Sequence, residues 1–171
     1  MLPFIDMDMH QLSRVTLLVA ALAALAPGAF AIEPDEPAPR FYATTLDGEK
    51  YSNDSIKGNV VLLQFWATWC KFCRGDQPVV DGLAREFSDR GLVILAIDVG
   101  ESKKTVKKYL AEMPRACKIV LTQDTNLAAI YAAKSYPLYV LIDRDGNVAG
   151  TQRGAGGERA LRSLLRKAGI E

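Results

Sequence analysis

The chain has 171 residues, of which 49% are hydrophobic and 24% charged. This composition suits one globular domain and excludes collagen, coiled coil and intrinsic disorder. Lysine and arginine number 21 against 20 acidic residues, so the net charge of +1 gives no reason to expect nucleic acid as a partner. Function must therefore be sought in local motifs.

The first 31 residues have the pattern of an export signal. Arg14 precedes an uncharged apolar run over residues 15–26, and a proline and a glycine break this run before the A-x-A cleavage pattern at residues 29–31. The run is shorter than the roughly 18 apolar residues of a membrane-spanning helix. We expect cleavage after Ala31 and a periplasmic or otherwise exported protein, with an uncleaved N-terminal membrane anchor as the alternative.

Removal of this segment would leave residues 32–171 without histidine, because the only histidine of the chain is His10. Ser-His and Cys-His catalytic pairs, and zinc sites with a histidine ligand, are thereby excluded. Two of the three cysteines, Cys70 and Cys73, have the C-x-x-C spacing. In an exported protein such a pair meets an oxidising compartment, so redox chemistry is the leading hypothesis.

Residues 32–39, rich in proline and acid, are predicted to form a linker, and residues 40–171 one domain of alternating strands and helices. In the first half of the domain the predicted elements are a hairpin of strands 40–45 and 49–51 around Asp47-Gly48, a buried central strand 60–66, a helix after Cys70 that ends near a C-cap glycine, Gly91, and a buried strand 92–97.

In the second half the predicted elements are a helix from an N-cap at Ser102 to Met113, a strand 118–121, a helix 125–132, a hairpin of strands 138–142 and 148–152, and an amphipathic helix 158–167. The turn at residues 143–147 resembles the opening of a calcium-binding loop. A calcium loop needs a glutamate at its twelfth position, which is Gly154 here, so we expect no metal.

The chemistry is concentrated where a strand gives way to the helix after Cys70. Free amides at a helix N-terminus stabilise a thiolate, so we expect a lowered pKa for the Cys70 thiol. Cys73, within the first turn, can close a disulfide, and the pair can exchange two electrons with another dithiol. Lys71 and Arg74 add positive charge. A static disulfide or half of a zinc ribbon is the alternative, but a ribbon needs a second C-x-x-C, and only Cys117 remains.

The run from Phe65 to Pro78, F-W-A-T-W-C-x-x-C-R-x-x-x-P, resembles the active-site signature of the thioredoxin superfamily in its exported TlpA/ResA-like branch. The likeness covers nearly all of the chain after the signal segment. It implies an α/β thioredoxin fold, with a central mixed β-sheet flanked by helices and an N-terminal β-hairpin extension. It also implies that Pro137 is a cis-proline that leaves the backbone of Tyr136 free to pair with a substrate strand.

Two departures from the branch pattern bear on mechanism. Phe72 stands where proline is common, so the redox potential does not follow from the likeness. Gln64 stands where thioredoxin buries an acid, whereas this branch can carry an acid three residues after the second cysteine, the position of Asp76. We hypothesise that Asp76 helps to deprotonate Cys73 when a mixed disulfide resolves. The alternative is an aspartate that satisfies amides or the dipole in the first helical turn.

The resulting prediction is an enzyme that exchanges the Cys70–Cys73 dithiol or disulfide with protein thiols and needs no organic cofactor. Cys70 is the outer nucleophile and Cys73 resolves the mixed disulfide. The residues expected to meet the substrate are Trp69, Lys71, Phe72, Tyr136 and Pro137, while Trp66 is assigned either to that surface or to the core. The resemblance favours a reductase for cytochrome c or copper-site maturation, fed by a membrane thiol-electron donor. We expect a monomer.

Several alternatives stay open. A thiol oxidant or isomerase would use the same residues, and a Cu(I)-binding chaperone would use the two thiolates as ligands, although related copper proteins add a histidine. A peroxiredoxin would need proline and threonine where the chain has Leu63 and Ala67. Cys117 is predicted to be a buried thiol that acts as a small hydrophobe, with a third redox centre or a dimer link as the alternative.

Overall fold

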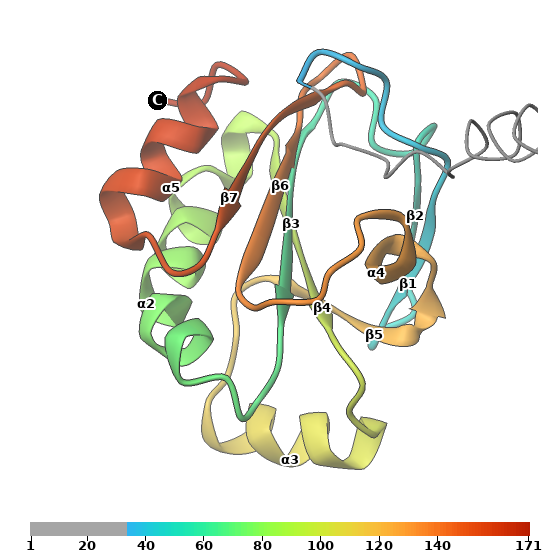
Figure 1. Ribbon diagram of the computed structural model, residues 1–171, viewed down its shortest axis with the longest axis vertical. Helices are drawn as coiled ribbons and strands as arrows, with labels where there is room; N and C mark the ends of the chain where they lie inside the picture. The colour runs from blue at the N-terminus through green and yellow to red at the C-terminus, as the bar shows by residue number, and fades with distance from the viewer. Residues whose placement is uncertain (1–33) are drawn as a thin grey trace, which may run out of the picture. The chain divides into compact units, whose positions relative to one another are not determined.

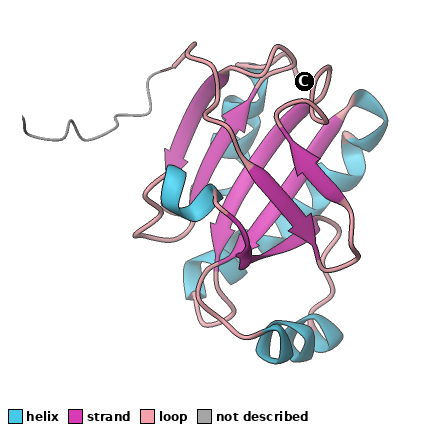
Figure 2. Ribbon diagram, turned by 90° about the vertical axis from the view of Figure 1, so that its right-hand side faces the viewer, coloured by secondary structure: helices cyan, strands magenta, loops and turns pink. Residues whose placement is uncertain are grey.

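The computed structural model describes residues 34–171, and the expected signal segment lies outside the described residues. One seven-stranded mixed sheet carries the fold, in the order β2-β1-β5-β4-β3-β6-β7. Figure 2 shows these strands side by side with helices before and behind them. Within residues 34–171, no helix has the length and apolar character that crossing a membrane requires.

The central strand, β3 (Val60–Trp66), is buried along its whole length. It pairs in parallel with β4 (Leu92–Asp98) and antiparallel with β6 (Leu138–Ile142). Its side chains alternate between two apolar clusters, one beneath α2 (Lys71–Glu86) and α5 (Gly157–Arg166), the other beneath α4 (Leu127–Ile130). Figure 1 shows α2 and α5 on one side of the sheet and α4 on the other. Burial on both faces explains the continuous apolar run in the sequence.

The N-terminal hairpin has the predicted form. Strands β1 (Tyr42–Thr45) and β2 (Lys50–Ser52) pair antiparallel, and Gly48 lies between them with a φ of +89°, a conformation that favours glycine. β1 also pairs antiparallel with β5 (Lys118–Thr125), which joins the hairpin to the sheet. The prediction of a mixed sheet flanked by helices, with a hairpin extension, is thereby confirmed.

The end of α2 differs from the prediction. The helix ends at Glu86, and a short 3₁₀ helix, η1 (Ser88–Arg90), follows it. Gly91, with a φ of +77°, therefore caps η1 rather than α2. Phe87 lies between the two helices with its side chain buried in the core, so the chain makes one further turn before it enters β4.

Two further elements have other lengths than predicted. β5 continues to Thr125, well past the expected end at residue 121, because its far end pairs with Ala43 of β1. The helix expected over residues 125–132 is the single turn α4. By contrast, α3 (Lys103–Glu112) has the predicted N-cap, since the Ser102 hydroxyl accepts a hydrogen bond from the Thr105 amide at 3.1 Å.

The described part of the expected linker lies along the hairpin of β6 and β7 (Val148–Arg153). Pro37 forms a bridge with Asn147, and the Ala38 amide donates to the Gly146 carbonyl at 2.9 Å. Ala38 is buried. The boundary between linker and domain at residue 40 stays a prediction.

Candidate redox site

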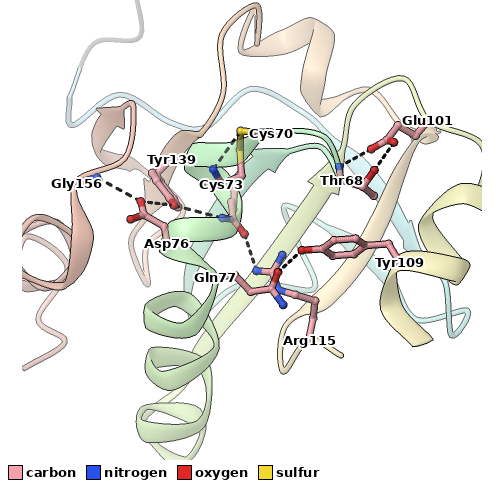
Figure 3. Close-up of a disulfide and its surroundings, with 11 residues drawn as sticks. Thr68, Cys70, Cys73, Asp76, Gln77, Glu101, Tyr109, Arg115, Tyr139 and Gly156 are labelled. Carbon is pink, nitrogen blue, oxygen red and sulfur yellow. Dashed lines mark hydrogen bonds between the residues drawn. A yellow bond between two sulfur atoms is a disulfide. The ribbon is translucent and has the colours of Figure 1, made fainter. Parts of the chain in front are cut away.

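Cys70 and Cys73 are joined by a disulfide at the N-terminus of α2, with 5.3 Å between their Cα atoms (Figure 3). Cys70 is the N-cap residue, and its Sγ accepts a hydrogen bond from the Cys73 amide at 3.1 Å. Both cysteines are nearly buried, with 5% and 2% of their surfaces exposed. The outer cysteine thus occupies the helix position that the prediction of a stabilised thiolate requires.

Exposed aromatic residues border the disulfide. Trp69 precedes Cys70 and is 63% exposed, and Phe72 precedes Cys73 and is 67% exposed. The Tyr136 side chain is half-buried, and its ring meets the Trp69 ring edge to face, with 6.1 Å between the ring centroids. We call Trp69, Phe72 and Tyr136 the aromatic rim. Two large exposed side chains beside a reactive group, here Trp69 and Phe72, are typical of a contact surface for a partner.

Pro137, Lys71 and Trp66 were also considered for the surface that contacts the substrate, and the structure places them differently. The peptide bond between Tyr136 and Pro137 is cis, as the resemblance implied, although the Pro137 side chain itself is buried. Lys71 is exposed at the start of α2. Trp66 is 1% exposed and packs against the Tyr109 ring, so it belongs to the core rather than to the contact surface.

Asp76 is buried one turn after Cys73, and its carboxylate is fully engaged (Figure 3). The Tyr139 hydroxyl donates to Oδ2 at 3.0 Å. The backbone amides of Gly156 and Gly157 donate to Oδ2 at 3.3 Å and to Oδ1 at 3.2 Å. The Cys73 sulfur lies in the disulfide and has no proton to share in this state. Three donors suit a carboxylate, which only accepts hydrogen bonds when it is ionised.

The glycine pair at the start of α5 makes this contact possible. A Cβ atom on Gly156 would lie 2.5 Å from the Ala160 Cβ atom, and Gly157 has a φ of +62°. A side chain at position 156 would clash with Ala160, whereas one at position 157 has space but would strain the left-handed backbone. The sequence Gly156-Gly157 therefore brings two amides against a carboxylate on another helix.

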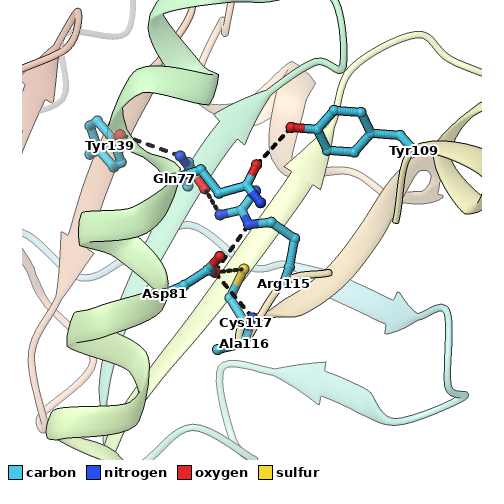
Figure 4. Close-up of polar contacts among 8 residues, drawn as sticks. Gln77, Asp81, Tyr109, Arg115, Ala116, Cys117 and Tyr139 are labelled. Carbon is cyan, nitrogen blue, oxygen red and sulfur yellow. Dashed lines mark hydrogen bonds and ion pairs between the residues drawn. The ribbon is translucent and has the colours of Figure 1, made fainter. Parts of the chain in front are cut away.

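A buried polar chain continues from Tyr139 into the core (Figure 4). The Tyr139 hydroxyl accepts from Gln64 Nε2 at 3.3 Å, and Gln64 Oε1 accepts from Arg115 Nη2 at 2.9 Å. Arg115 Nε donates to Asp81 Oδ1 at 3.0 Å, and the Arg115 side chain is only 1% exposed. Asp76 and Asp81, on the same helix, are thus linked through side chains of β3, β6 and the segment before β5.

Cys117 lies next to this chain and is buried. Burial raises the pKa of its thiol to about 12, and the Asp81 carboxylate, 3.7 Å from the sulfur, acts in the same direction. A thiol with so high a pKa is unreactive near neutral pH. The prediction of a buried thiol is confirmed, but the thiol also donates a hydrogen bond to Asp81 Oδ1 and so does not act only as a small hydrophobe.

Sequence reasoning singled out Gln64 and Asp76 but missed their partners Tyr139, Arg115 and Asp81. A signal was available in α2, where Asp76, Gln77 and Asp81 fall on the core-facing side of an amphipathic helix. Buried polar side chains are almost always hydrogen-bonded, so these positions required partners. The partners themselves come from distant segments and have no local signature.

The comparison with protein families gives the deciding observation. Residues 34–151, more than half of the chain, match the family described as AhpC/TSA. The chain belongs to the AhpC/TSA family. This AhpC/TSA protein is 31% identical over 130 residues to the thiol-disulfide oxidoreductase ResA of Bacillus cereus, a match that spans 76% of this chain and 75% of ResA. It is 35% identical over 117 residues to the thioredoxin-like protein YneN of Bacillus subtilis, spanning 67% and 68% of the two chains.

Solved structures agree with these relatives. The crystal structure of a thiol:disulfide interchange protein of the thioredoxin family from Chlorobium tepidum matches with a TM-score of 0.68 and 26% identity, covering 81% of this chain and 99% of that chain. The fold of this AhpC/TSA protein is therefore thioredoxin-like, as the resemblance implied. The protein is a thiol-disulfide oxidoreductase with a C-x-x-C redox pair.

Proposed function

We propose that this protein reduces disulfides of partner proteins in an exported compartment and is recharged by a membrane thiol-electron donor. The observation that supports it most directly is the Cys70–Cys73 pair at the N-terminus of α2, beside exposed aromatic side chains. The cytochrome c or copper-site maturation proteins suggested by the resemblance are the proposed partners. Export rests on the signal pattern of residues 1–31.

The proposed reaction is a pair of thiol-disulfide exchanges. The Cys70 thiolate attacks one sulfur of the substrate disulfide, forms a mixed disulfide and releases the first substrate thiolate. The Cys73 thiolate then attacks the Cys70 sulfur, releases the second substrate thiolate and closes the Cys70–Cys73 disulfide. The substrate gains two electrons and two protons, and the enzyme loses them. A dithiol of the donor restores the enzyme by the same steps in reverse.

Asp76 is the proposed proton acceptor for Cys73. It follows Cys73 by one helical turn, so the two side chains share a face of α2. The Tyr139 hydroxyl and the amides of Gly156 and Gly157 donate to the Asp76 carboxylate and hold this side chain in its buried position. Transfer of the Cys73 proton to this carboxylate would generate the thiolate that resolves the mixed disulfide.

The aromatic rim and Pro137 are proposed to receive an extended apolar segment of the substrate beside its disulfide. Trp69 and Phe72 offer exposed ring surface, and Lys71, between Cys70 and Phe72, offers a positive charge. The free backbone of Tyr136 would pair with the substrate strand.

The test of direction is a redox titration of the purified protein against glutathione or dithiothreitol, with the thiols of Cys70 and Cys73 counted by alkylation and mass spectrometry. A reductase is expected to have a potential near or below about −220 mV. A potential near about −120 mV would make the protein a disulfide donor and overturn the proposed direction. A pair that does not cycle, together with stoichiometric Cu(I) retention lost in Cys70→Ser, would favour the copper chaperone instead.

A further inference from the structure

Two acidic residues that the site described above does not include, Asp98 and Glu101, lie at the same edge of the sheet as the disulfide. Asp98 ends β4 and is paired in register with Trp66, which ends β3, and Glu101 follows three residues later. The loop that leads from Trp66 to Cys70 therefore starts beside Asp98. The mechanism proposed above uses neither acid.

Glu101 holds this loop through Thr68 (Figure 3). The Thr68 amide donates to Glu101 Oε2 at 2.6 Å, and the Thr68 hydroxyl donates to Oε1 at 2.6 Å. Both carboxylate oxygens are thus bound to one residue, two positions before Cys70. Hydrogen bonds to an ionised acceptor are the stronger kind, so this contact fixes the approach of the chain to α2.

Asp98 is completely buried and has an unsatisfied oxygen. Its Oδ1 accepts from the Glu101 amide at 3.2 Å, but among residues 34–171 its Oδ2 has no hydrogen-bond donor. Burial, followed by the hydrogen bond with Glu101, raises the pKa of Asp98 to about 8. A proton on Asp98 Oδ2 would turn this oxygen into a donor toward Glu101 and would supply the hydrogen bond that the oxygen lacks.

Glu101 has the complementary environment. Partial burial acts to raise its pKa, but hydrogen bonds from Asp98 and Thr68 outweigh burial and hold that pKa below the usual value. The residues paired in register with Asp98, Trp66 of β3 and Leu121 of β5, do not titrate in this range, and neither does Thr122, whose hydroxyl donates to the Asp98 carbonyl. The lysines at the start of α3 are exposed. The proton state of the pair thus depends on the two carboxyl groups themselves.

We propose that Asp98 and Glu101 are positioning residues for Cys70, which share one proton and hold the Cys70 loop through Thr68. The proposal rests on thiol-disulfide exchange at Cys70. With one proton present, Asp98 donates to Glu101, and Glu101 binds Thr68. When alkaline solution removes that proton, two adjacent carboxylates repel each other, and the hold on Thr68 weakens. The N-cap position of Cys70, which stabilises its thiolate, is then less well fixed.

The test compares the parent protein with Asp98→Asn in equilibrium with dithiothreitol from pH 6 to 9.5. The asparagine amide donates to Glu101 at every pH, so this variant keeps the neutral-pH arrangement. Because dithiothreitol titrates identically in both samples, the ratio of the two equilibrium constants isolates the protein. We expect the two constants to agree within about twofold below pH 7. Above pH 8.5 the parent should be less easily reduced than Asp98→Asn, by up to about tenfold, the size expected for one hydrogen bond to a charged group.

Glu101→Ala removes the hold on Thr68 at every pH. This variant should be about tenfold less easily reduced than the parent at pH 7. The ratio of its equilibrium constant to that of Asp98→Asn should not change between pH 6 and 9.5. The proton itself is measured in the oxidised parent by ¹³C NMR of side-chain carboxyl carbons, one of which should titrate near pH 8 and be absent from Asp98→Asn.

Three results would overturn the proposal. The first is a ratio of parent to Asp98→Asn that stays constant over the whole pH range. The second is a set of carboxyl resonances in the parent that all titrate below pH 6. In either case the disulfide would still cycle, so the proposed function would stand. The third is a parent disulfide that does not cycle with dithiothreitol, which would overturn the proposed function and this inference together.

Discussion

At the scale of single residues, Asp76 carries the sharpest prediction. Asp76→Asn keeps the size of the side chain but removes the proton acceptor proposed for Cys73. Resolution of a trapped mixed disulfide should slow by on the order of a hundredfold at neutral pH, the size expected when a general base is lost. The measurement follows release of a chromophoric thiol from Cys70 by stopped flow between pH 5 and 9.

The matched control is Asp89→Asn, an exposed aspartate of η1. It should resolve the mixed disulfide at the parent rate. If Asp76→Asn also resolved at the parent rate throughout this pH range, Asp76 would be a structural acid that satisfies Tyr139 and the two glycine amides.

The aromatic rim gives a prediction about substrate recognition. Trp69→Ala and Phe72→Ala each remove exposed ring surface without disturbing the core. We expect kcat/KM for a protein disulfide substrate to fall about tenfold in each variant, while reduction of the enzyme by dithiothreitol changes little, because the small thiol does not contact the rim.

Tyr42→Ala is the control for the rim. Tyr42 is 58% exposed, close to Trp69 in exposure, but it lies on β1, three strands away from β3 in the sheet. Its loss should leave both reactions unchanged. Equal losses in Tyr42→Ala and Trp69→Ala would contradict recognition by the rim.

The sequence identified the residues whose local pattern carries chemistry. The C-x-x-C spacing marks Cys70 and Cys73, and the likeness to a family marks Pro137 and Asp76. Tyr139 and Glu101 were missed because their roles depend on contacts with residues 63 and 33 positions away in the chain. Such contacts follow from the packing of whole elements and leave no periodic pattern in the sequence.

At the scale of elements, α2 is tied to the segment before β5 by a buried ion pair. The Arg115 guanidinium contacts Asp81 of α2 and lies over the Trp66 ring at 5.0 Å. Arg115→Met should destabilise the protein by about 3–5 kcal/mol, because the Asp81 carboxylate would stay buried without its cation. Chemical denaturation of the oxidised protein measures this free energy.

The double variant Arg115→Met, Asp81→Leu tests the reason for that loss. With both charges gone, most of the lost stability should return, since a buried ion pair can often be replaced by apolar side chains. Lys57→Ala, which breaks an exposed pair with Asp54, should cause no measurable change. A double variant as unstable as Arg115→Met would show that packing, and not an uncompensated charge, is responsible.

Element boundaries show where sequence patterns lose their power. The apolar run of β3 predicted its bounds because burial on both faces leaves no polar positions within it except Gln64. The end of α2 was misplaced because Gly91 suits any left-handed cap, and only the buried position of Phe87 shows that a 3₁₀ turn intervenes. The far end of β5 was missed because the strand is extended by the pairing of Thr125 with Ala43 of β1 across a register shift, which alternation in the sequence does not reveal.

At the scale of the whole molecule, residues 34–171 contain no histidine, so few groups titrate between pH 5 and 8. In the pair of Asp98 and Glu101 the environment shifts the two carboxyl pKa values in opposite directions, that of Asp98 upward and that of Glu101 downward. Asp98 has a pKa of about 8 in the folded state, above the usual value near 4. A group whose pKa is higher in the folded state than in the unfolded state stabilises the fold. This stabilisation is complete below the unfolded-state pKa and is lost as the pH rises through the folded-state pKa.

We therefore expect the free energy of unfolding to fall as the pH rises from roughly 5 to 7.5, by on the order of 1 kcal/mol for each pH unit, because the folded pair retains a proton that the unfolded chain has released. Below about pH 4 the slope should reverse, since Glu101, whose pKa is held low in the fold, stays ionised there while the unfolded chain takes up its proton. Urea unfolding at half-unit steps of pH measures this profile. Asp98→Asn should flatten the slope between pH 5 and 7.5, and an unchanged slope in that variant would place the proton elsewhere in the molecule.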